Sequence, residues 1–483
     1  SLSARGMHTL LLDGILKAFK IPANLYFHDL LARADGRIDD KNSLTISHFT
    51  SKDKLYHKED GQKTDFSWGT TMTYAKWRSR WGPDLSSVLT LARSAYSTDS
   101  WTKTFGSPKE GYRIGLKDLV GKMDLVKGGS GSHDMRFGLE GIRHTFVPEA
   151  DFGDGMAGHD DEGSVGRYIG FEGAVYAEDN FKAGDRLSVA AGLRMSVFSH
   201  GKVTRLSPEP RISVSFGNDN GLLAKAGYSK VSQYIHQLSS PTASLPVDMM
   251  VPVTGKIGPE TSDQVSIGLT LNRFQGWEIS LEGYWKRLRN ILEYKDGVAF
   301  IEDFGTWEGD VSAGIARSRG VELLVRKTEG RTTGSLGYTL SKSERRFPHG
   351  SISGGEWFPA RYDCRHSCSV VLDHKLGRSW DAGAAWTYSS GGAFTVPEPD
   401  GRMPRRGNLR LPPSHRLDLG LSHHKARRRG ERVWNLSVYN AYNRKNPNLV
   451  FLVSGEEDDG PGSSLKTVSF LPVIPSVSYT RVF

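Results

Sequence analysis

The sequence of 483 residues contains no long apolar run and no leader-like beginning. No segment reaches the eighteen or so consecutive apolar residues that a membrane-spanning helix needs. The start, S-L-S-A-R-G-M-H, has no basic stretch followed by an apolar core, so we expect no signal peptide in this sequence. A soluble propeller would show a blade motif about every forty residues, and none is found. These absences exclude a helical membrane protein and argue against a propeller.

Cysteine is scarce, with only Cys364 and Cys368. On an extended strand their separation is about 13 Å, which is too far for a disulfide unless a local turn intervenes. Two thiols are also too few for a zinc site. We therefore treat both cysteines as structurally incidental, leave their bridging open, and expect no metal and no cofactor.

Signs of nucleic-acid binding or of enzymatic chemistry are also lacking. The net charge of +9 is spread along the chain, and its one cluster, K-A-R-R-R-G-E at 425–431, is expected to be a solvated turn. The segment G-G-S-G-S at 128–132 is expected to be a turn and not a phosphate-binding loop. We predict neither a nucleic-acid partner nor an enzyme.

What the chain does contain is strand-like alternation. Apolar residues occupy every second position at 187–197 and at 265–272, where small polar residues or glycines fill most of the positions between them. Such alternation is typical of a strand with one apolar and one wet face. Similar segments recur along the chain, and no helical segment is present that would cover the sheet. The predicted fold is therefore all-β, a transmembrane antiparallel up-and-down β-barrel with a hydrated lumen.

The predicted connections alternate between short and long, which is the pattern of outer-membrane barrels with short periplasmic turns and long external loops. The short ones are predicted at 36–41, 80–84, 127–132, 180–185, 217–221, 273–276, 327–332, 376–379 and 425–431. The long ones are predicted at 7–23, 51–66, 97–110, 147–164, 199–208, 232–261, 295–314, 344–365, 393–413 and 446–465. This gives about twenty strands, whereas plugged transporter barrels have about twenty-two.

The last segment, 466–483, is predicted to be the closing strand. Val477, Tyr479 and Phe483 fall on one face, and the chain ends on Phe, as in barrels whose terminal aromatic is read by the barrel-assembly machinery. Arg481 departs from this pattern, and near the membrane rim its long side chain would snorkel toward water. The soluble alternative is a barrel or sandwich that happens to end in Phe.

Four motifs, in order, resemble the TonB-dependent outer-membrane receptors. They are K-A-G-Y-S-K-V-S-Q-Y-I-H-Q-L-S-S at 225–240, N-I-L-E-Y-K-D-G at 290–297, G-Y-T-L-S-K-S-E-R-R-F at 337–347 with G-E-W-F-P-A-R-Y-D at 355–363, and V-Y-N-A-Y-N-R-K-N-P at 438–447. The resemblance covers nearly the whole chain. It departs at Cys364 and Cys368, where Arg and Asp are expected, and nothing resembles the plug domain or the TonB box. We therefore expect residues 1–483 to form the barrel domain, with the plug and first strands missing or on another segment.

The resemblance implies a receptor in the outer membrane of a Gram-negative cell that imports a scarce, bulky nutrient. An iron chelate, a cobalamin, an oligosaccharide and a peptide are all open as substrates, and energy would come through TonB. The implied partners are the lipid bilayer, a plug segment, the TonB complex and the barrel-assembly machinery, and a surface lipoprotein is left open. The alternative is an outer-membrane barrel or adhesin that transports nothing, or a degenerate receptor fragment.

Candidate site residues follow from loop position and from alternation. Aromatic rings and Arg on external loops suit sugars, peptides or anionic chelates. The substrate-binding candidates are Tyr234, His236, Trp307, Trp357, Phe358 and Arg361. For 357–359 the alternative is that these residues only fold their own loop together. Arg194, Arg211 and Lys225 are expected to face the lumen and to contact plug carboxylates.

Overall fold

The structure is a computed structural model, and it describes residues 1–7, 23–59, 62–104, 109–129, 131–151, 168–218, 221–238, 249–298, 307–396, 404–427, 430–447, 449–457, 460–469 and 472–482. Most of these residues lie in β-strands. The helical turns in this part of the chain are the 3-10 turns η1 (Trp307–Gly309) and η2 (Ser353–Gly355). Across the described ranges, no helix is long and apolar enough to span a bilayer.

One 21-stranded sheet dominates the molecule. Its strands are β1 (Leu2–Met7), β2 (Ala23–Arg37), β3 (Asn42–Glu59), β4 (Gln62–Arg80), β5 (Leu85–Thr104), β6 (Lys109–Lys127), β7 (His133–Asp151), β8 (Tyr168–Ala183), β9 (Leu187–His200), β10 (Val203–Gly217), β11 (Leu222–Gln233), β14 (Glu260–Leu271), β15 (Trp277–Tyr294), β16 (Val311–Lys327), β17 (Thr332–Arg346), β18 (Phe358–Pro359), β19 (His366–Lys375), β20 (Trp380–Ser389), β23 (Ser414–Ala426), β24 (Glu431–Tyr439) and β27 (Ile474–Val482). Three two-stranded ladders lie in the connections: β12 (Ile235–Leu238) with β13 (Met249–Pro252), β21 (Ala393–Phe394) with β22 (Leu409–Arg410), and β25 (Leu449–Glu457) with β26 (Gly460–Val468).

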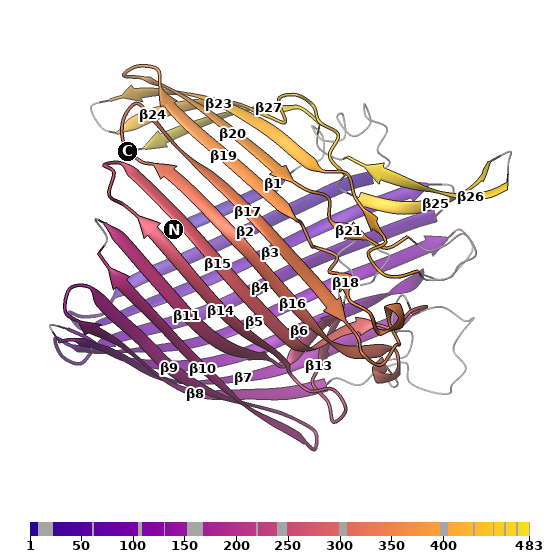
Figure 1. Cartoon of the computed structure of the whole chain (residues 1–483), viewed down its shortest axis with the longest axis horizontal. Coiled ribbons are helices and arrows are strands. Elements are labelled where there is room, and N and C mark those ends of the chain that lie inside the picture. The colour runs from indigo at the N-terminus through magenta and orange to yellow at the C-terminus, as the bar shows by residue number, and fades with distance from the viewer. Residues whose placement is uncertain are drawn as a thin grey trace.

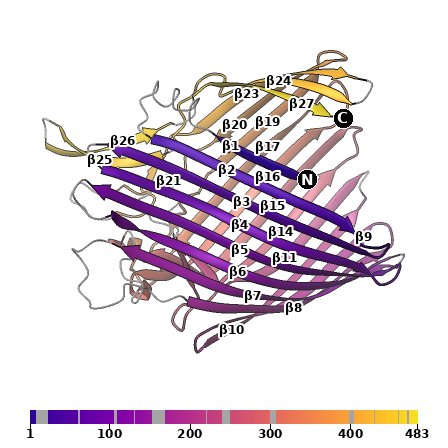
Figure 2. The same cartoon turned by 180° about the vertical axis from the view of Figure 1, so that it is seen from behind.

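The long strands pair antiparallel with their neighbours in chain order, and the sheet curls around a lumen (Figure 1 and, from behind, Figure 2). The short β18 pairs only with the end of β17. Both chain ends lie at the end of the barrel that carries the short turns. In the described ranges no pairing joins β1 to β27. The all-β, antiparallel up-and-down fold and the count of about twenty wall strands are confirmed.

The outer face of the wall is apolar, as the alternation predicted. On β14, Val265, Ile267 and Leu269 are 47%, 65% and 47% exposed, although they are large apolar residues. The residues between them, such as Ser266 and Gly268, lie on the inner face. Exposed apolar side chains at every second position are unfavourable in water and suited to lipid, because a bilayer solvates that face.

The predicted short turns are confirmed to within about two residues, except that the turn predicted from residue 180 begins after Ala183; the link 376–379, for example, lies between β19 and β20. Three predicted long loops are wrong. Residues 51–59 and 62–66 belong to β3 and β4, which stay paired up to Glu59 and Gln62. Residues 97–104 and 109–110 belong to β5 and β6. Around 199–208 a tight turn joins His200 to Val203. These hairpins continue past the apolar band because the hydrogen bonds between paired strands do not require apolar side chains. A prediction based on the polarity of the side chains therefore made these strands too short.

The predicted last strand was also misplaced at its start. β27 begins at Ile474, and residues 460–468 instead form β26, which pairs with β25 in the external connection. β24 ends at Tyr439 because Asn440 has a φ of 53° and Asn443 a φ of 54°. The Asn440 side chain holds this turn, accepting from Arg444 N at 2.9 Å and donating to Arg444 O at 2.9 Å. Of the three residues predicted to form the barrel-assembly signal, Phe483 lies outside the described residues. Val477 and Tyr479 are exposed.

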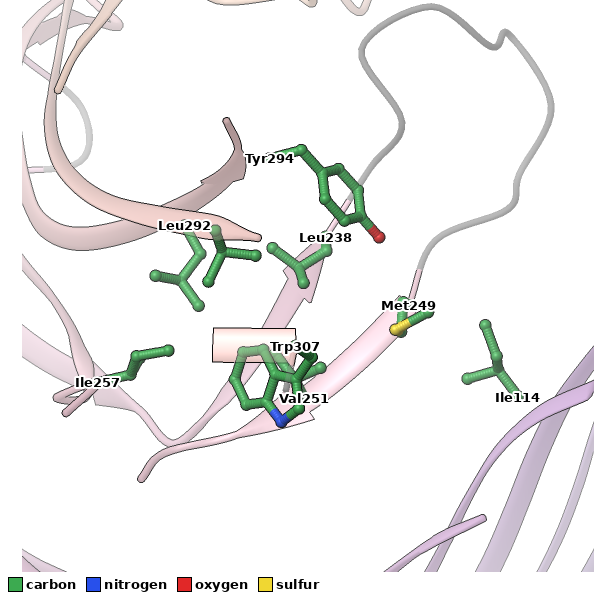
Figure 3. Packing of buried hydrophobic residues seen from close by; sticks show 9 residues of the cluster. Ile114, Leu238, Met249, Val251, Ile257, Leu292, Tyr294 and Trp307 are labelled. Carbon is green, nitrogen blue, oxygen red and sulfur yellow. The ribbon is translucent and has the colours of Figure 1, made fainter. Parts of the chain in front are cut away.

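A compact apolar core lies at the long-loop end of the barrel, where the β12–β13 hairpin reaches from the end of β11 to β6 and β15 (Figure 3). Leu238, Met249 and Val251 of this hairpin pack with the residues Ile114, Ile257, Leu292, Tyr294, Trp307 and Val311, all of them at most 6% exposed. Figure 3 shows Trp307 beside Val251, and Leu238 near Tyr294. Burial of this kind is worth about 1.5–3 kcal/mol for each large side chain, so the hairpin is a fixed shelf across part of the mouth.

Candidate functional site

The second assembly at the long-loop end is a set of three connections locked together by one arginine. Arg406 has only 4% of its side chain exposed. Its Nε donates to Asp296 Oδ1 at 2.9 Å, its Nη1 to Glu293 Oε2 at 3.1 Å and its Nη2 to the carbonyl of Tyr294 at 2.6 Å. Since Arg406 is more than one hundred residues from these partners in sequence, the contact ties the connection 390–413 to the end of β15. Buried ion pairs hold only when hydrogen bonds satisfy both charges, as they do here.

Asp363, in the connection between β17 and β19, likewise links two connections through a buried charge. Its side chain is fully buried, and it accepts from Ser343 N at 2.6 Å and from the guanidinium of Arg410. Arg410 also donates to the Asp363 carbonyl at 2.7 Å. The carboxylate thus joins the connection 347–365 to the connection 390–413. We call the three connections 295–310, 347–365 and 390–413, as far as they are described, the mouth platform.

A hollow of about 80 Å³ opens on the mouth platform between Glu293, Arg345, Arg361, Tyr362 and Arg406. Arg345 donates from Nη1 to Glu293 Oε1 at 2.7 Å and from Nη2 to the Tyr362 hydroxyl at 2.9 Å. Its guanidinium also lies 5.4 Å from the centre of the Tyr362 ring. Tyr362 is 67% exposed, and Arg361 is exposed beside it. Carboxylates already engage Arg345 and Arg406, so the exposed groups at the edge of the hollow are the Arg361 guanidinium and the Tyr362 phenol. The volume of the hollow fits one polar substituent of a larger ligand.

Two of the predicted binding residues, Arg361 and Trp357, lie on the mouth platform with side chains that reach its surface. Arg361 borders the hollow. Trp357 is half-buried, with the Arg317 guanidinium 4.1 Å above its ring centre. Phe358 is 3% exposed and stacks on Phe347 with ring centres 5.9 Å apart. Phe358 thus packs inside its own connection, as the alternative for 357–359 described.

Tyr234 and His236 lie on the β12–β13 shelf, and each is 1% exposed. Tyr234 stacks on Phe198 at 5.3 Å, and its hydroxyl lies 2.8 Å from Ser196 Oγ. His236 places Nε2 3.0 Å from the Gly258 carbonyl, so Nε2 carries the proton. Burial lowers the pKa of His236 to about 4, which keeps the ring neutral. Trp307 is 6% exposed and belongs to the apolar core around Leu238, Met249 and Val251, whereas Tyr234 packs with Phe198 and Val253. These three side chains support the shelf, and contact with a ligand would require it to move.

The three basic residues expected in the lumen lie on the inner face by register. Arg194 of β9 lies between wall carboxylates, 3.1 Å from Glu140, 3.7 Å from Glu172 and 3.8 Å from Glu209. Arg211 pairs with Glu178. Lys225, opposite Ser215 and Gly268, is exposed and makes no ion pair with the described residues. Arg194 and Arg211 are thus held by the wall itself, and of the three Lys225 is the most available for a plug carboxylate.

Sequence reasoning missed Arg345, Tyr362 and Arg406. Tyr362 stands inside the motif G-E-W-F-P-A-R-Y-D at 355–363, and its position directly after Arg361 was the available signal. Arg406 lies in an irregular segment with no periodicity, and its partners are distant in sequence. No local pattern marks such a residue.

The sequence matches the family described as "TonB dependent receptor-like, beta-barrel" over residues 20–443. No curated protein sequence matches this chain. Among solved structures, the ferric yersiniabactin uptake receptor FyuA from Yersinia pestis superposes with a TM-score of 0.67 at 13% identity, covering 95% of this chain and 71% of that one. The ferric-catecholate import receptor Fiu from Escherichia coli K12 superposes with a TM-score of 0.65 at 12% identity, covering 95% of this chain and 75% of that one.

The siderophore receptor PirA from Acinetobacter baumannii gives a TM-score of 0.62 at 12% identity, with 87% of this chain and 67% of that one covered. A ferric enterobactin receptor from Pseudomonas aeruginosa, PfeA, is covered over 65% of its length. At such identities the superpositions establish the shared fold. The family consists of transport receptors in the outer membrane, which are not enzymes, and the apolar outer face described above agrees with that location. The chain belongs to the family of TonB-dependent receptor-like β-barrels.

Proposed function

We propose that this chain is the barrel of an outer-membrane receptor that imports a bulky anionic iron chelate with energy supplied through TonB. The observation that carries the proposal is the exposed pair Arg361 and Tyr362 beside the hollow of the mouth platform. Guanidinium groups bind carboxylate and catecholate oxygens through charge-assisted hydrogen bonds, and a phenol ring stacks on an aromatic ligand. The matched structures named for ferric siderophores support the choice of an iron chelate over a cobalamin, an oligosaccharide or a peptide.

The mouth platform is suited to ligand binding because buried side chains beneath its surface fix its backbone. Arg406 and Asp363 fix the three connections through buried charge-assisted contacts. A ligand that meets a preorganised surface loses less conformational entropy on binding. A plug segment inside the lumen, the barrel-assembly machinery and a surface lipoprotein lid belong to the same proposal as partners of the complete receptor.

The test is binding of iron-labelled ferric complexes to outer membranes that contain the protein. The ligands are a ferric catecholate, a ferric hydroxamate and ferric citrate, with cyanocobalamin as the comparison without iron. We expect saturable binding of at least one ferric complex. Replacing both residues, Arg361→Ala with Tyr362→Ala, should weaken it about tenfold or more, because hydrogen bonds to charged groups are worth about 1.5–3 kcal/mol each. Uptake that stops when the proton gradient is collapsed would support TonB coupling.

Lys256→Ala is the control, since Lys256 is also at the long-loop end, has 82% of its side chain exposed, pairs with Glu308 at 3.3 Å and does not line the hollow. It should leave binding unchanged. Binding of none of the ferric complexes, or equal losses in the double variant and the control, would overturn the assignment of the ligand site.

A further inference from the structure

Four aromatic rings form a row on the outer face of the barrel near the short-turn end. The register places Trp380 of β20 opposite His423 of β23, His423 opposite Trp434 of β24, and Trp434 opposite Tyr479 of β27. Ring centres lie 4.6 Å apart for Trp380 and His423 and 4.8 Å apart for Trp434 and Tyr479. Trp380, Trp434 and Tyr479 are 44%, 53% and 46% exposed. We call these four residues the ring row.

Each member of the ring row has a cation two residues away on the same strand or in its adjoining turn, on the side nearer the short turns. Lys425 follows His423 on β23, Arg432 precedes Trp434 on β24, and Arg481 follows Tyr479 on β27. The register sets Lys425 opposite Arg432 and Arg432 opposite Arg481. Arg378, two residues before Trp380, lies exposed in the adjoining turn 376–379. We call Arg378, Lys425, Arg432 and Arg481 the cation row.

Like charges directly opposite one another on neighbouring strands destabilise a sheet. Two nearby carboxylates do not contact Lys425 or Arg432. Glu431 and Asp381 lie on the inner face by alternation, where they contact His424 at 3.0 Å and 3.1 Å. Within the described part of the chain Arg378, Lys425 and Arg432 make no ion pair with a carboxylate. The arrangement is one that an anion from outside the protein would stabilise.

The next row toward the middle of the wall is apolar, and it includes Leu436 and Val477, which are 50% and 66% exposed. From the wall centre to the rim, the outer face therefore changes from apolar to aromatic to cationic. That is the order of acyl chain, interface and headgroup in a phospholipid leaflet. In outer-membrane barrels the short turns face the periplasm, so this rim meets the inner leaflet.

The same level of the wall is different on other strands. Beyond Trp77 of β4, the outward positions are Ser79 with Asn42 on β3 and Ser87 on β5, all of them neutral. On β15, Trp277 faces Lys327 in the register, and Lys327 lies 5.7 Å from the centre of the Trp277 ring. The concentration of rings and cations on β20, β23, β24 and β27 thus exceeds that at these other two sites.

We propose that the ring row and the cation row together bind the phosphate headgroup of an anionic glycerophospholipid of the inner leaflet. The cations contact the phosphate, and the rings lie at the level of the glycerol backbone. The inference depends on the location of the barrel in the outer membrane and is independent of which nutrient the receptor carries.

The test uses the full chain purified in a zwitterionic detergent, freed of lipid and titrated with phosphatidylglycerol, with bound lipid counted by native mass spectrometry. The double variant Lys425→Gln with Arg432→Gln should weaken binding about thirtyfold, the effect expected for two cations at an anionic membrane surface. The control Arg186→Gln with Arg273→Gln removes the same charge from exposed positions in other short turns. It should leave binding unchanged.

Equal losses in the two double variants, or equal affinity of the unaltered protein for phosphatidylcholine, would overturn the proposal. So would displacement of the lipid by excess inorganic phosphate, because the site would then bind a free ion. A photoactivatable phosphatidylglycerol on the unaltered protein gives a readout that does not depend on how a variant folds. It should crosslink to peptides from β20, β23, β24 and β27, and crosslinking confined to other strands would also refute the site.

Discussion

Arg406 offers the sharpest test of how the mouth platform is held. In Arg406→Met the side chain keeps most of its length but loses its contacts to Asp296, Glu293 and the Tyr294 carbonyl. Breaking a buried ion pair by removing one partner costs about 3–5 kcal/mol. Glu293 keeps its contact with Arg345 at 2.7 Å, so we take the lower end, about 3 kcal/mol. The cost should appear as local opening of the platform, since the strands of the wall do not depend on Arg406.

Hydrogen exchange of the folded protein measures this opening. The amides of Ser353 and Arg406 are informative, because Ser353 N donates to Asp296 Oδ2 at 2.8 Å and Arg406 N donates to Ser353 Oγ at 2.9 Å. A loss of about 3 kcal/mol should speed their exchange roughly one-hundredfold, at about 1.4 kcal/mol for each factor of ten.

The neighbouring residue is the control for this experiment. Arg405 is 57% exposed; it pairs at 3.4 Å with Glu356, which is 67% exposed, and it also donates to the Trp357 carbonyl at the surface. An exposed pair of this kind contributes at most about 1 kcal/mol. Arg405→Met should therefore change exchange in the platform by less than about tenfold. Equal effects of the two variants, or unchanged exchange in Arg406→Met, would refute the view that Arg406 locks the three connections.

Two further predictions concern the shelf and one of the turns. The pKa of His236 in the folded protein is lowered to about 4, so between about pH 6.5 and 4 the unfolded ring binds more protons than the folded one. The shelf should therefore be fully stable above about pH 6.5. It should lose up to roughly 3 kcal/mol of stability as the pH falls to 4. Hydrogen exchange of 235–238 and 249–252 should show this loss, and His236→Gln should abolish its dependence on pH. At the end of β10, Gly217 has a φ of 127° and an added Cβ would lie 2.0 Å from the Leu222 carbonyl oxygen, whereas Gly184, in the turn after β8, has a φ of 67° and open space around it. Gly217→Ala should destabilise the barrel in urea by about 1–3 kcal/mol and Gly184→Ala by about 1 kcal/mol, and equal midpoints would contradict this reasoning.

The wall of the barrel was predictable because its signal is local. Alternation at 265–272 and at 187–197 specifies which side chains face lipid, since a strand turns successive residues to opposite faces. All the short turns were located for the same reason, and only the start of the one predicted at 180–185 was off by more than about two residues. The ends of β3 to β6 and of β9 and β10 were not located, because their outer parts are held by ladder hydrogen bonds that any residue except proline makes.

By itself, the sequence determined the fold class, the number of wall strands, the two faces of the sheet and the resemblance to a receptor family. Only the tertiary structure decided which loop side chains reach the surface. Tyr234, His236 and Phe358 look like binding residues in the sequence and are buried in the structure, whereas Tyr362 is exposed. Arg406 acquires its role from partners more than one hundred residues away. The ring row and the cation row likewise exist only because the register aligns four strands. Alternation is a property of neighbouring residues, but burial and cross-strand alignment depend on contacts between distant parts of the chain, which no local pattern encodes.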